Sequence, residues 1–408
     1  MKKYISLALT AAMCLSLAGC TGGAKDETTT AAQTTQATEQ TDAQTEAQTE
    51  EQTTQATASD EMRDITAKEL VSEMKIGWNL GNVLDSVNDS IAIDADPYEF
   101  ETAWGAQYTS QMQIDYVLDA GYNVIRIPVS WANHIHDDGS YTIEESWMDR
   151  VQEVVDYAYG RGAYVILNTH HEAWCYTFAD NEEAAATELA AVWTQIGTRF
   201  ADYGDHLIFE GLNEPRKVGA GNEWYGDDEG RQIVNHLEQV FYDTVRGLGG
   251  KNADRFLMIT GYAASSSTTN LQAITLPNPD DDKLIISVHA YIPYSFALDT
   301  KGTDTWNNAT SDIDNLMRDL KSLFIDKGIP VIIGEMAAVN KDNDAERIAW
   351  VEYYINAAKA IGVPCCWWDN HSFTGDGENL GLLRCQGMNI SWKFPDLVET
   401  MISAAYAE

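Results

Sequence analysis

Short runs of apolar residues alternate along most of the chain with longer stretches in which apolar positions recur at helical spacing. From about Met62 onward there are eight such runs, each of a length typical of a buried strand. The runs are Ile76–Leu80, Val124–Val129, Tyr164–Asn168, Leu207–Leu212, Phe256–Ile259, Leu284–Val288, Val331–Ile333 and Pro364–Trp368. The pattern therefore predicts eight buried strands.

The stretches between the runs predict helices. They are Ser110–Ala120, Ser146–Gly160, Glu183–Tyr203, Arg231–Leu248, Ser311–Asp326 and Ala345–Ala360, and a last helix is expected after Ser391. The helix signal is weakest after Gly261, where Ser265–Ile274 is expected to hold only a short helix. Eight strands that are each followed by a helix predict an α/β fold, a (β/α)8 TIM barrel that forms one domain over residues 61–408.

A doubly wound open sheet is the structural alternative to the barrel. The segment from Gly77 to Gly81 lacks the third glycine of the dinucleotide-binding turn that such sheets often carry. A phosphate-binding P-loop motif is also absent from the sequence. Both observations favour the barrel.

The first 60 residues have a different character. Lys2 and Lys3 precede an apolar segment, Ile5–Leu17, that is too short to span a bilayer. The segment ends in Leu17-Ala18-Gly19-Cys20, which resembles the lipobox of bacterial lipoproteins. That resemblance implies a signal peptide over residues 1–19, cleavage before Cys20 and diacylation of its thiol. An ordinary secretory signal with an incidental cysteine is the alternative.

Residues 20–60 are dominated by Thr, Gln, Ala and Glu, and residues 21–60 contain no aromatic and no large aliphatic side chain. Such a segment cannot bury enough apolar surface to offset the entropy of ordering it. We therefore predict a disordered tether that precedes the barrel. Together with the lipobox, the tether predicts an extracellular protein that is anchored to the bacterial membrane through the lipid on Cys20, or is secreted.

The composition narrows the kind of partner. The formal net charge of −37 argues against a nucleic acid, because binding phosphate groups requires a cationic surface. A neutral polysaccharide is indifferent to that charge. The 12 Trp and 19 Tyr residues suit such a partner, since flat aromatic faces can cover sugar rings, although core packing is expected to take more than half of them.

The cysteines outside the signal peptide are Cys20, Cys175, Cys365, Cys366 and Cys385. No zinc-type pair spacing occurs among them. Adjacent Cys365 and Cys366 should point to opposite faces of their strand. We expect mostly reduced, buried thiols, and a Cys366–Cys385 disulfide remains open.

A barrel predicts that functional side chains lie just past the C-terminal ends of the strands, because those ends meet at one mouth. Seven of the eight predicted strands carry aromatic or ionisable residues at or near that end. The positions are Trp78-Asn79-Leu80-Gly81-Asn82, Arg126, Asn168-Thr169-His170-His171-Glu172, Asn213-Glu214-Pro215, His289-Ala290-Tyr291, Gly334-Glu335 and Trp367-Trp368-Asp369-Asn370. The sequence therefore predicts a site at this mouth.

Two glutamates, Glu214 and Glu335, end the fourth and seventh strands, which face each other across the mouth. Hydrolysis of a glycosidic bond needs one carboxylic acid to protonate the leaving oxygen and a second carboxylate to attack the anomeric carbon or to activate water. A separation of about 5–5.5 Å gives retention and a wider gap gives inversion, and the sequence leaves that distance open. His170 and His171 could ligate zinc, but no third ligand follows at a recognised spacing. We expect no metal and no cofactor.

Neighbouring residues suggest different roles for the two glutamates. Arg126 and Tyr291 are expected to hold Glu335 as an anion, the form that acts as a nucleophile. Glu214 is then the general acid/base, and the nearby Glu335 anion is expected to raise its pKa. His289 is expected to influence that protonation equilibrium.

The same residues resemble the motifs of glycoside hydrolase family 5, a family of retaining β-glycanases. Asn213-Glu214-Pro215 is similar to the acid/base motif of the family, and Ile333-Gly334-Glu335 is similar to its nucleophile motif. The resemblance covers about Met74 to Trp392. It implies a catalytic set of Glu214, Glu335, Arg126, His170, Asn213, His289 and Tyr291. His170 is preferred over His171 because it alternates with Asn168 on the inward face.

Three further motifs resemble subfamily 4 most closely. They are Gly77-Trp78-Asn79-Leu80-Gly81-Asn82, Val129-Ser130-Trp131 and Trp367-Trp368-Asp369-Asn370. The resemblance implies endo-β-1,4-glucanase activity, often with xyloglucan or mixed-linkage β-glucan also cleaved. Two departures bear on fine specificity: Glu172-Ala173-Trp174-Cys175-Tyr176, where a further acidic residue is expected before the Trp, and His371, where a glycine is more usual.

Other residues near the mouth are candidates for substrate contact. Asn213 is expected to donate to the sugar 2-hydroxyl, and Trp368 to provide a flat platform at the cleavage subsite. The remaining substrate-binding candidates are Asn79, Trp131, His134, His171, Trp174 and Asp369, and Trp224 and Trp306 are further candidate platforms.

The resemblance implies a retaining endo-β-1,4-glucanase that hydrolyses plant β-glucans (cellulose, mixed-linkage glucan and xyloglucan), and we expect a monomer. A β-mannanase or xylanase on the same barrel is the alternative enzyme. A non-catalytic glycan-binding lipoprotein is the alternative outside the enzymes. It would lack one catalytic glutamate and form two lobes, whereas the sequence has both glutamates and eight evenly spaced strand–helix units.

Overall fold

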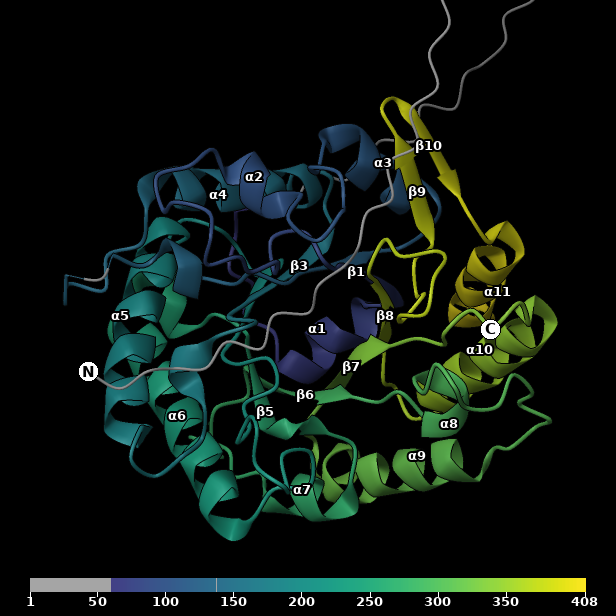
Figure 1. Cartoon of the computed structure of the whole chain (residues 1–408). Coiled ribbons are helices and arrows are strands. Elements are labelled where there is room, and N and C mark those ends of the chain that lie inside the picture. The colour runs from purple at the N-terminus through teal and green to yellow at the C-terminus, as the bar shows by residue number, and fades with distance from the viewer. Residues whose placement is uncertain (1–59, 137) are drawn as a thin grey trace, which may run out of the picture. The chain divides into compact units, whose positions relative to one another are not determined.

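The computed structural model describes residues 60–136 and 138–408, so the predictions for the signal peptide, Cys20 and nearly all of the tether lie outside the described residues. Eight parallel strands close into a barrel in the order β1 to β8 (Figure 1). The strands are β1 Ile76–Leu80, β2 Val124–Ile127, β3 Tyr164–Asn168, β4 Leu207–Glu210, β5 Leu257–Ser265, β6 Leu284–His289, β7 Val331–Met336 and β8 Cys365–Asp369. The predicted (β/α)8 barrel is confirmed.

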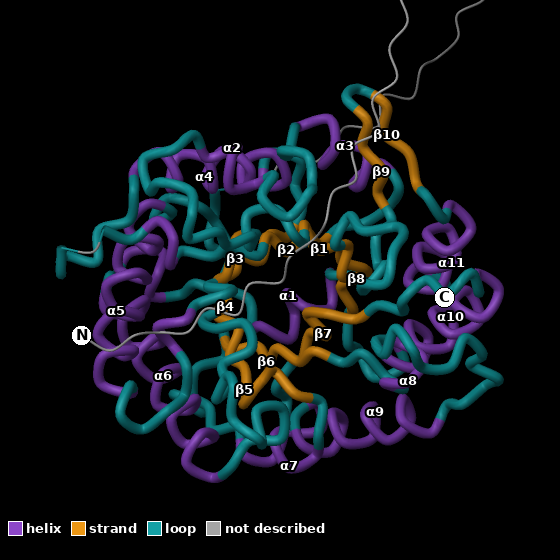
Figure 2. Tube along the Cα trace, in the orientation of Figure 1, coloured by secondary structure: helices purple, strands orange, loops and turns teal. Residues whose placement is uncertain are grey.

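Helices surround this ring of strands, except α1, which lies across the opening of the ring, as Figure 2 shows. They are α1 Ala67–Glu73, α2 Pro97–Glu101, α3 Gln111–Asp119, α4 Glu145–Tyr159, α5 Glu182–Arg199, α6 Asp228–Gly247, α7 Thr268–Ala273, α8 Tyr294–Ala297, α9 Ser311–Leu323, α10 Asp344–Lys359 and α11 Pro395–Tyr406. The six predicted long helices, the last helix and the short helix after Gly261 are confirmed. No helix in the described part of the chain is both long and apolar enough to cross a membrane.

Several elements escape prediction from periodicity. The helices α1, α2 and α8 are short, and β9 (Leu383–Gln386) and β10 (Asn389–Trp392) form a hairpin outside the barrel. Strand β5 is longer than its apolar run because it continues through Gly261. Its pairing with β6 shifts register between Thr260 and Ser265, an irregularity that a pattern of apolar positions does not reveal.

An apolar cluster fills the N-terminal half of the barrel interior, and α1 covers it. Val124, Ile166, Ile208 and Cys366 point into this cluster together with Leu70 of α1. A capping box starts the helix, since the Glu69 N–H donates to Thr66 Oγ1 and the Thr66 N–H donates to the Glu69 carboxylate. The polar residues of the interior are therefore confined to the opposite, C-terminal half.

The cysteines behave as alternation predicts. Cys366 lies in the inner cluster and Cys365 in the core between strands and helices. The suggestion of a Cys366–Cys385 disulfide is wrong, because Cys366 is inside the barrel while Cys385 lies on β9 outside it. Both are free thiols.

Candidate active site

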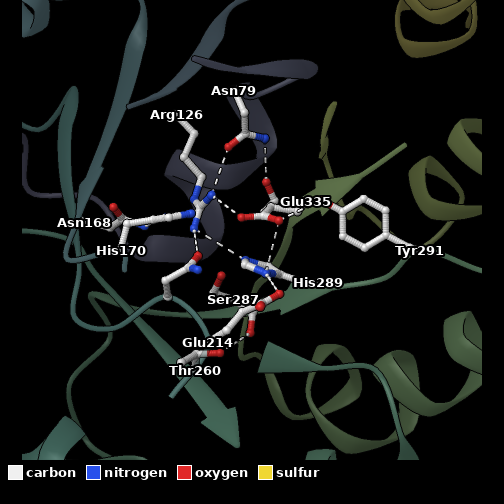
Figure 3. Close-up of polar contacts among 12 residues, drawn as sticks. Asn79, Arg126, Asn168, His170, Glu214, Thr260, Ser287, His289, Tyr291 and Glu335 are labelled. Atoms are coloured by element: carbon white, nitrogen blue, oxygen red, sulfur yellow. Dashed lines mark hydrogen bonds and ion pairs between the residues drawn. The ribbon is translucent and has the colours of Figure 1, made fainter. Parts of the chain in front are cut away.

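A polar layer occupies the C-terminal half of the barrel interior. Because side chains alternate along a strand, Asn79, Arg126 and Asn168 point inward from β1, β2 and β3, and Ser287 points inward from β6 (Figure 3). Glu210 of β4 points inward as well, since its carboxylate accepts from Arg126. All five side chains are buried. They form the floor of the barrel mouth.

Arg126 is the centre of this floor. Its five N–H groups are directed at Glu210 Oε2 (2.7 Å), Glu335 Oε1 (2.8 Å), Asn79 Oδ1 (2.9 Å), Asn213 Oδ1 (2.7 Å) and His289 Nε2 (3.5 Å). Burial opposes the charge, but the Glu210 and Glu335 carboxylates beside it raise the pKa of Arg126. The guanidinium is therefore a permanent cation that fixes side chains from several strands.

Glu335, at the end of β7, has both oxygens held by fixed donors. Oε1 accepts from Arg126, and Oε2 accepts from the hydroxyl of Tyr291 at 2.7 Å. Burial, and then the Glu335 carboxylate, raise the pKa of Tyr291, so this phenol stays a donor. The predicted grouping of Arg126, Tyr291 and Glu335 is present.

Glu214 follows β4 and meets Glu335 through His289. Because Arg126 donates toward His289 Nε2, the proton of a neutral imidazole belongs on Nδ1. Nδ1 lies 2.9 Å from Glu214 Oε1 and 3.5 Å from Glu335 Oε2. One oxygen from each glutamate and one nitrogen of His289 all lie within 4.8 Å of one another.

The protonation of Glu214 differs from the sequence-based expectation. Burial raises the pKa of Glu214, but the hydrogen bond from His289 and the charge of Arg216 outweigh it, so the pKa lies below its ordinary value. The prediction of a raised pKa is wrong in direction. It considered only the anion of Glu335 and not the donors that tertiary packing brings to Glu214.

His170 and Trp368 form one wall of the mouth. Their rings are parallel, with 5.4 Å between centroids and 2° between planes. Asn168 Oδ1 accepts the Val129 N–H at 3.0 Å, so the Asn168 amide group points at His170 Nδ1, 3.1 Å away. His170 therefore carries its proton on Nε2. Trp368 is 8% exposed at the end of β8, and His171 is turned toward solvent.

The prediction that Asn79 contacts substrate is wrong. It is fully buried, and its Nδ2 donates to the carbonyl oxygens of Gly334 at 2.9 Å and Trp367 at 3.2 Å. Its Oδ1 is occupied by Arg126. Asn79 therefore positions Arg126 and ties β1 to β7 and β8.

Trp131 and His134 are core residues, so their prediction as substrate contacts is wrong. Trp131 is fully buried, and its Nε1 donates to the Asn168 carbonyl at 3.0 Å. His134 is stacked on Trp147 with 3.6 Å between ring centroids, and burial lowers the pKa of His134 to about 3. Neither ring has a face available for a sugar.

Asp369 and Trp306 are also wrongly predicted to contact substrate. Asp369 is fully buried and accepts from Trp78 Nε1 at 2.9 Å and from the N–H groups of Leu383 (2.7 Å) and His371 (3.0 Å). It therefore joins the end of β8 to β1 and β9. Trp306 is buried in the outer core.

Three predicted substrate contacts remain available on the surface. The His171 side chain is 39% exposed, Trp174 is half-buried, and Trp224 is exposed with its ring 4.1 Å from the Arg216 guanidinium carbon. Arg216 in turn lies 3.5 Å from Glu214 Oε2. These three stay predictions.

The structure shows what surrounds the two departures from the family pattern. Glu172 is buried and accepts the N–H groups of Trp131 (2.6 Å) and Ala132 (3.0 Å), and burial raises its pKa to about 8. It therefore braces the segment after β2. His371 has a φ of 54°, a conformation in which glycine is unstrained.

Sequence reasoning missed Glu210 and Ser287. Glu210 Oε1 accepts from Ser287 Oγ at 2.6 Å, and Oε2 accepts from Arg126. The sequence does carry a signal for Glu210, because its carboxylate lies inside a run that predicts a buried strand, and a buried carboxylate is rarely without a cation beside it.

In the folded structure Asp85 lies near His170 and His171 and could be a third metal ligand beside them. Asp85, His170 and His171 each offer one atom within 4.8 Å of the others. However, Asn168 donates to His170 Nδ1 and leaves the proton on Nε2, so neither nitrogen offers an unshared pair. This set does not suit a metal ion.

Comparison with known proteins bears on this site. The family model described as cellulase (glycosyl hydrolase family 5) matches residues 90–374. Endoglucanase 1 from Ruminococcus albus is 50% identical over 350 residues, which cover 86% of this chain and 84% of that protein. A broad-specificity endoglucanase of family 5 subfamily 4 from Ruminococcus champanellensis, with bound cellotriose, is 44% identical with a TM-score of 0.80, over 84% of this chain and 99% of that chain.

A second solved structure widens the range of relatives. A xyloglucan-specific endo-β-1,4-glucanase from a metagenomic library, in complex with cellotriose, is 39% identical with a TM-score of 0.78. The match covers 83% of this chain and 98% of that chain. Both structural similarities therefore extend over nearly the whole of the solved chains.

Proposed function

This chain belongs to glycosyl hydrolase family 5, and on that premise we propose that its barrel mouth hydrolyses β-1,4-glucans at internal bonds with retention of configuration. The supporting observation is the spacing of the two carboxylates, whose nearest oxygens and His289 Nδ1 fall within 4.8 Å of one another. Retaining enzymes place their carboxyl groups about 5–5.5 Å apart, too close for a water between them.

The reaction then proceeds in two displacements. An oxygen of Glu335 forms a bond to the anomeric carbon while the bond from that carbon to the glycosidic oxygen breaks, and Glu214 gives its proton to the leaving oxygen. Next, Glu214 takes a proton from water as the water oxygen attacks the anomeric carbon, and the ester to Glu335 breaks. Two inversions return the β configuration.

The proton of the first step is carried by Glu214. Since Glu214 Oε1 accepts from His289 Nδ1, Oε2 is the oxygen that carries the acid proton. A bound sugar excludes water from the mouth and increases the burial of Glu214, and burial favours the neutral carboxyl. We infer that substrate binding itself moves Glu214 toward its acidic form.

The surrounding donors suit the sugar at the cleavage point. Asn213 Oδ1 is occupied by Arg126, which leaves Nδ2 as the group that donates to the 2-hydroxyl. His170 contributes its Nε2–H to another hydroxyl, and Trp368, which is 8% exposed at the mouth, packs against the sugar ring. Arg126 acts through Glu335 and Asn213 and is a positioning residue.

The proposed substrates are neutral β-glucans: cellulose, mixed-linkage glucan and xyloglucan. All three relatives described above are endoglucanases. One of the two solved structures is of broad specificity and the other is xyloglucan-specific, and both hold cellotriose. The acidic character of the chain, with a net charge of −37, is compatible with an uncharged polymer. Mannan and xylan are the substrates of the alternative enzymes.

The test is an assay of the chain on carboxymethylcellulose, mixed-linkage glucan, xyloglucan, xylan and mannan. We expect a rapid fall in viscosity on the glucans with few new reducing ends, since internal cleavage shortens chains quickly. NMR of the first products should show the β anomer before mutarotation. Activity confined to mannan or xylan would overturn the substrate, and an initial α anomer would overturn retention.

We further propose that residues 1–19 are a lipoprotein signal peptide, that Cys20 carries the lipid, and that residues 20–60 tether the catalytic domain of residues 61–408 outside the cell as a monomer. The lipobox supports the signal peptide and the lipid on Cys20, and the composition of residues 20–60 supports the tether. Labelled palmitate should enter the wild-type chain in a bacterial host and not Cys20→Ala. Equal labelling of the two would contradict the anchor.

A further inference from the structure

A continuous series of rings leads from the catalytic mouth to the surface. Trp368 is parallel to His170, His170 meets His171 edge-on at 4.4 Å between centroids, and His171 meets Trp104 at 5.5 Å. Trp104 follows α2 and is 41% exposed. The segment that carries α2 therefore extends the aromatic lining of the mouth outward.

That segment concentrates exposed apolar side chains. Four of the nine large hydrophobic residues that are exposed in the described part of the chain lie between residues 98 and 112. They are Tyr98 (42% exposed), Trp104 (41%), Tyr108 (52%) and Met112 (44%). Scattered surface hydrophobics need no explanation, but a cluster of this kind indicates a binding surface.

The exposed rings are held in place from beneath. The rings of Tyr98 and Tyr108 lie 4.8 Å apart at an angle of 30°, and the guanidinium of Arg150 lies 5.1 Å from the Tyr98 ring. Arg150 is buried on α4, beside α2 (Figure 1), and forms an ion pair with Glu101.

The backbone of the segment is braced as well. Glu101 Oε2 accepts the N–H of Thr109 at 2.9 Å, and Trp104 Nε1 donates to the carbonyl of Val87 at 3.2 Å. Rings that are fixed before binding lose little entropy when a ligand covers them. The exposed rings are therefore preorganised for binding a ligand.

We propose that Tyr98, Trp104 and Tyr108, named here the aromatic platform, bind a β-glucan chain where it leaves the mouth on the side of β1 to β3. The inference rests on the proposed function. Tyrosine and tryptophan combine a flat apolar face with a polar edge, which suits a pyranose with apolar C–H faces and hydroxyl rims. Trp104 joins the platform to the lining of the mouth through His171, and Tyr98 and Tyr108 lie on the same chain segment as Trp104.

Charge argues against a membrane as the occupant. The chain carries a net charge of −37, and bacterial membranes with anionic lipids attract cationic segments rather than acidic ones. A second copy of this equally acidic chain would bring like charges together. A neutral glucan carries no charge and is repelled by neither effect.

The test compares two double variants of the full chain. Tyr98→Ala with Tyr108→Ala removes both rings, and Tyr98→Phe with Tyr108→Phe keeps the rings but removes the hydroxyls. We expect the alanine pair to bind mixed-linkage glucan about tenfold more weakly in affinity gel electrophoresis, and the phenylalanine pair to bind within about twofold of wild type. Tyr406→Ala, an exposed tyrosine on α11, serves as a control.

Turnover of a short aryl cellobioside separates this proposal from the proposed function. The aryl cellobioside is too short to cover the platform, so its kcat/KM should be the same in wild type and in the alanine pair. If wild type cleaves no glucan, the proposed function fails. If wild type is active and the alanine pair binds polymer normally, the platform proposal fails. A dimer of wild type that the alanine pair abolishes would also overturn it.

Discussion

Glutamine in place of Glu335 is expected to lower kcat on β-glucan by about 10⁴-fold or more, because an amide cannot form the glycosyl ester. The fold should survive, since the amide keeps an oxygen for the Tyr291 hydroxyl and Arg126 keeps its bond to Glu210. The measurement is the rate of new reducing ends on mixed-linkage glucan, with the unfolding temperature as a check on folding.

Glu210→Gln is the matched control for Glu335→Gln. The variant removes the second carboxylate that pairs with the Arg126 guanidinium. Glu210 itself performs no chemistry, because it is buried below the mouth. Loss of one partner of a buried ion pair is expected to cost about 3 kcal/mol of stability, while most of the activity remains. If Glu335→Gln keeps more than a tenth of wild-type activity, Glu335 is not the nucleophile.

Alanine in place of Glu214 is expected to lower kcat on glucan by about 10³- to 10⁴-fold, because the leaving oxygen is no longer protonated. A substrate with a good leaving group, such as a dinitrophenyl cellobioside, should still form the ester to Glu335 at a rate close to that of wild type. Hydrolysis of that ester then becomes slow, because no base activates water.

Azide distinguishes the roles of the two glutamates. In Glu214→Ala it should attack the ester from the side vacated by the carboxylate, restore turnover and give a β-glycosyl azide. In Glu335→Ala it should replace the nucleophile and give an α-glycosyl azide from the same substrate. NMR of the products assigns the anomer, and the reverse pattern would exchange the two roles.

The sequence determined the architecture and the location of the site. Eight apolar runs separated by helical stretches indicate a parallel sheet that is covered on both faces, and the missing dinucleotide-binding turn favours a barrel over an open sheet. The C-terminal ends of parallel strands meet at one mouth, so Glu214 and Glu335 were placed together from their positions in the chain alone. The relatives confirm the family that these motifs resemble.

Alternation along strands carried the prediction further, but only within strands. It correctly separated Cys365 from Cys366 on β8. It does not apply past the strand ends, where loops set direction and burial. For this reason Trp131 was predicted at the substrate, although packing of the segment after β2 encloses it.

The ionic state of the mouth was decided only by the tertiary structure. The Glu210 carboxylate under Arg126, and the His289 ring between Glu214 and Glu335, come from strands far apart in sequence. Coulombic and hydrogen-bond energies depend on separations of a few ångströms, which no pattern of residue types encodes. The sequence therefore identified the two acids of the site, and the packing of the barrel set the distance between them and the donors that each of them meets.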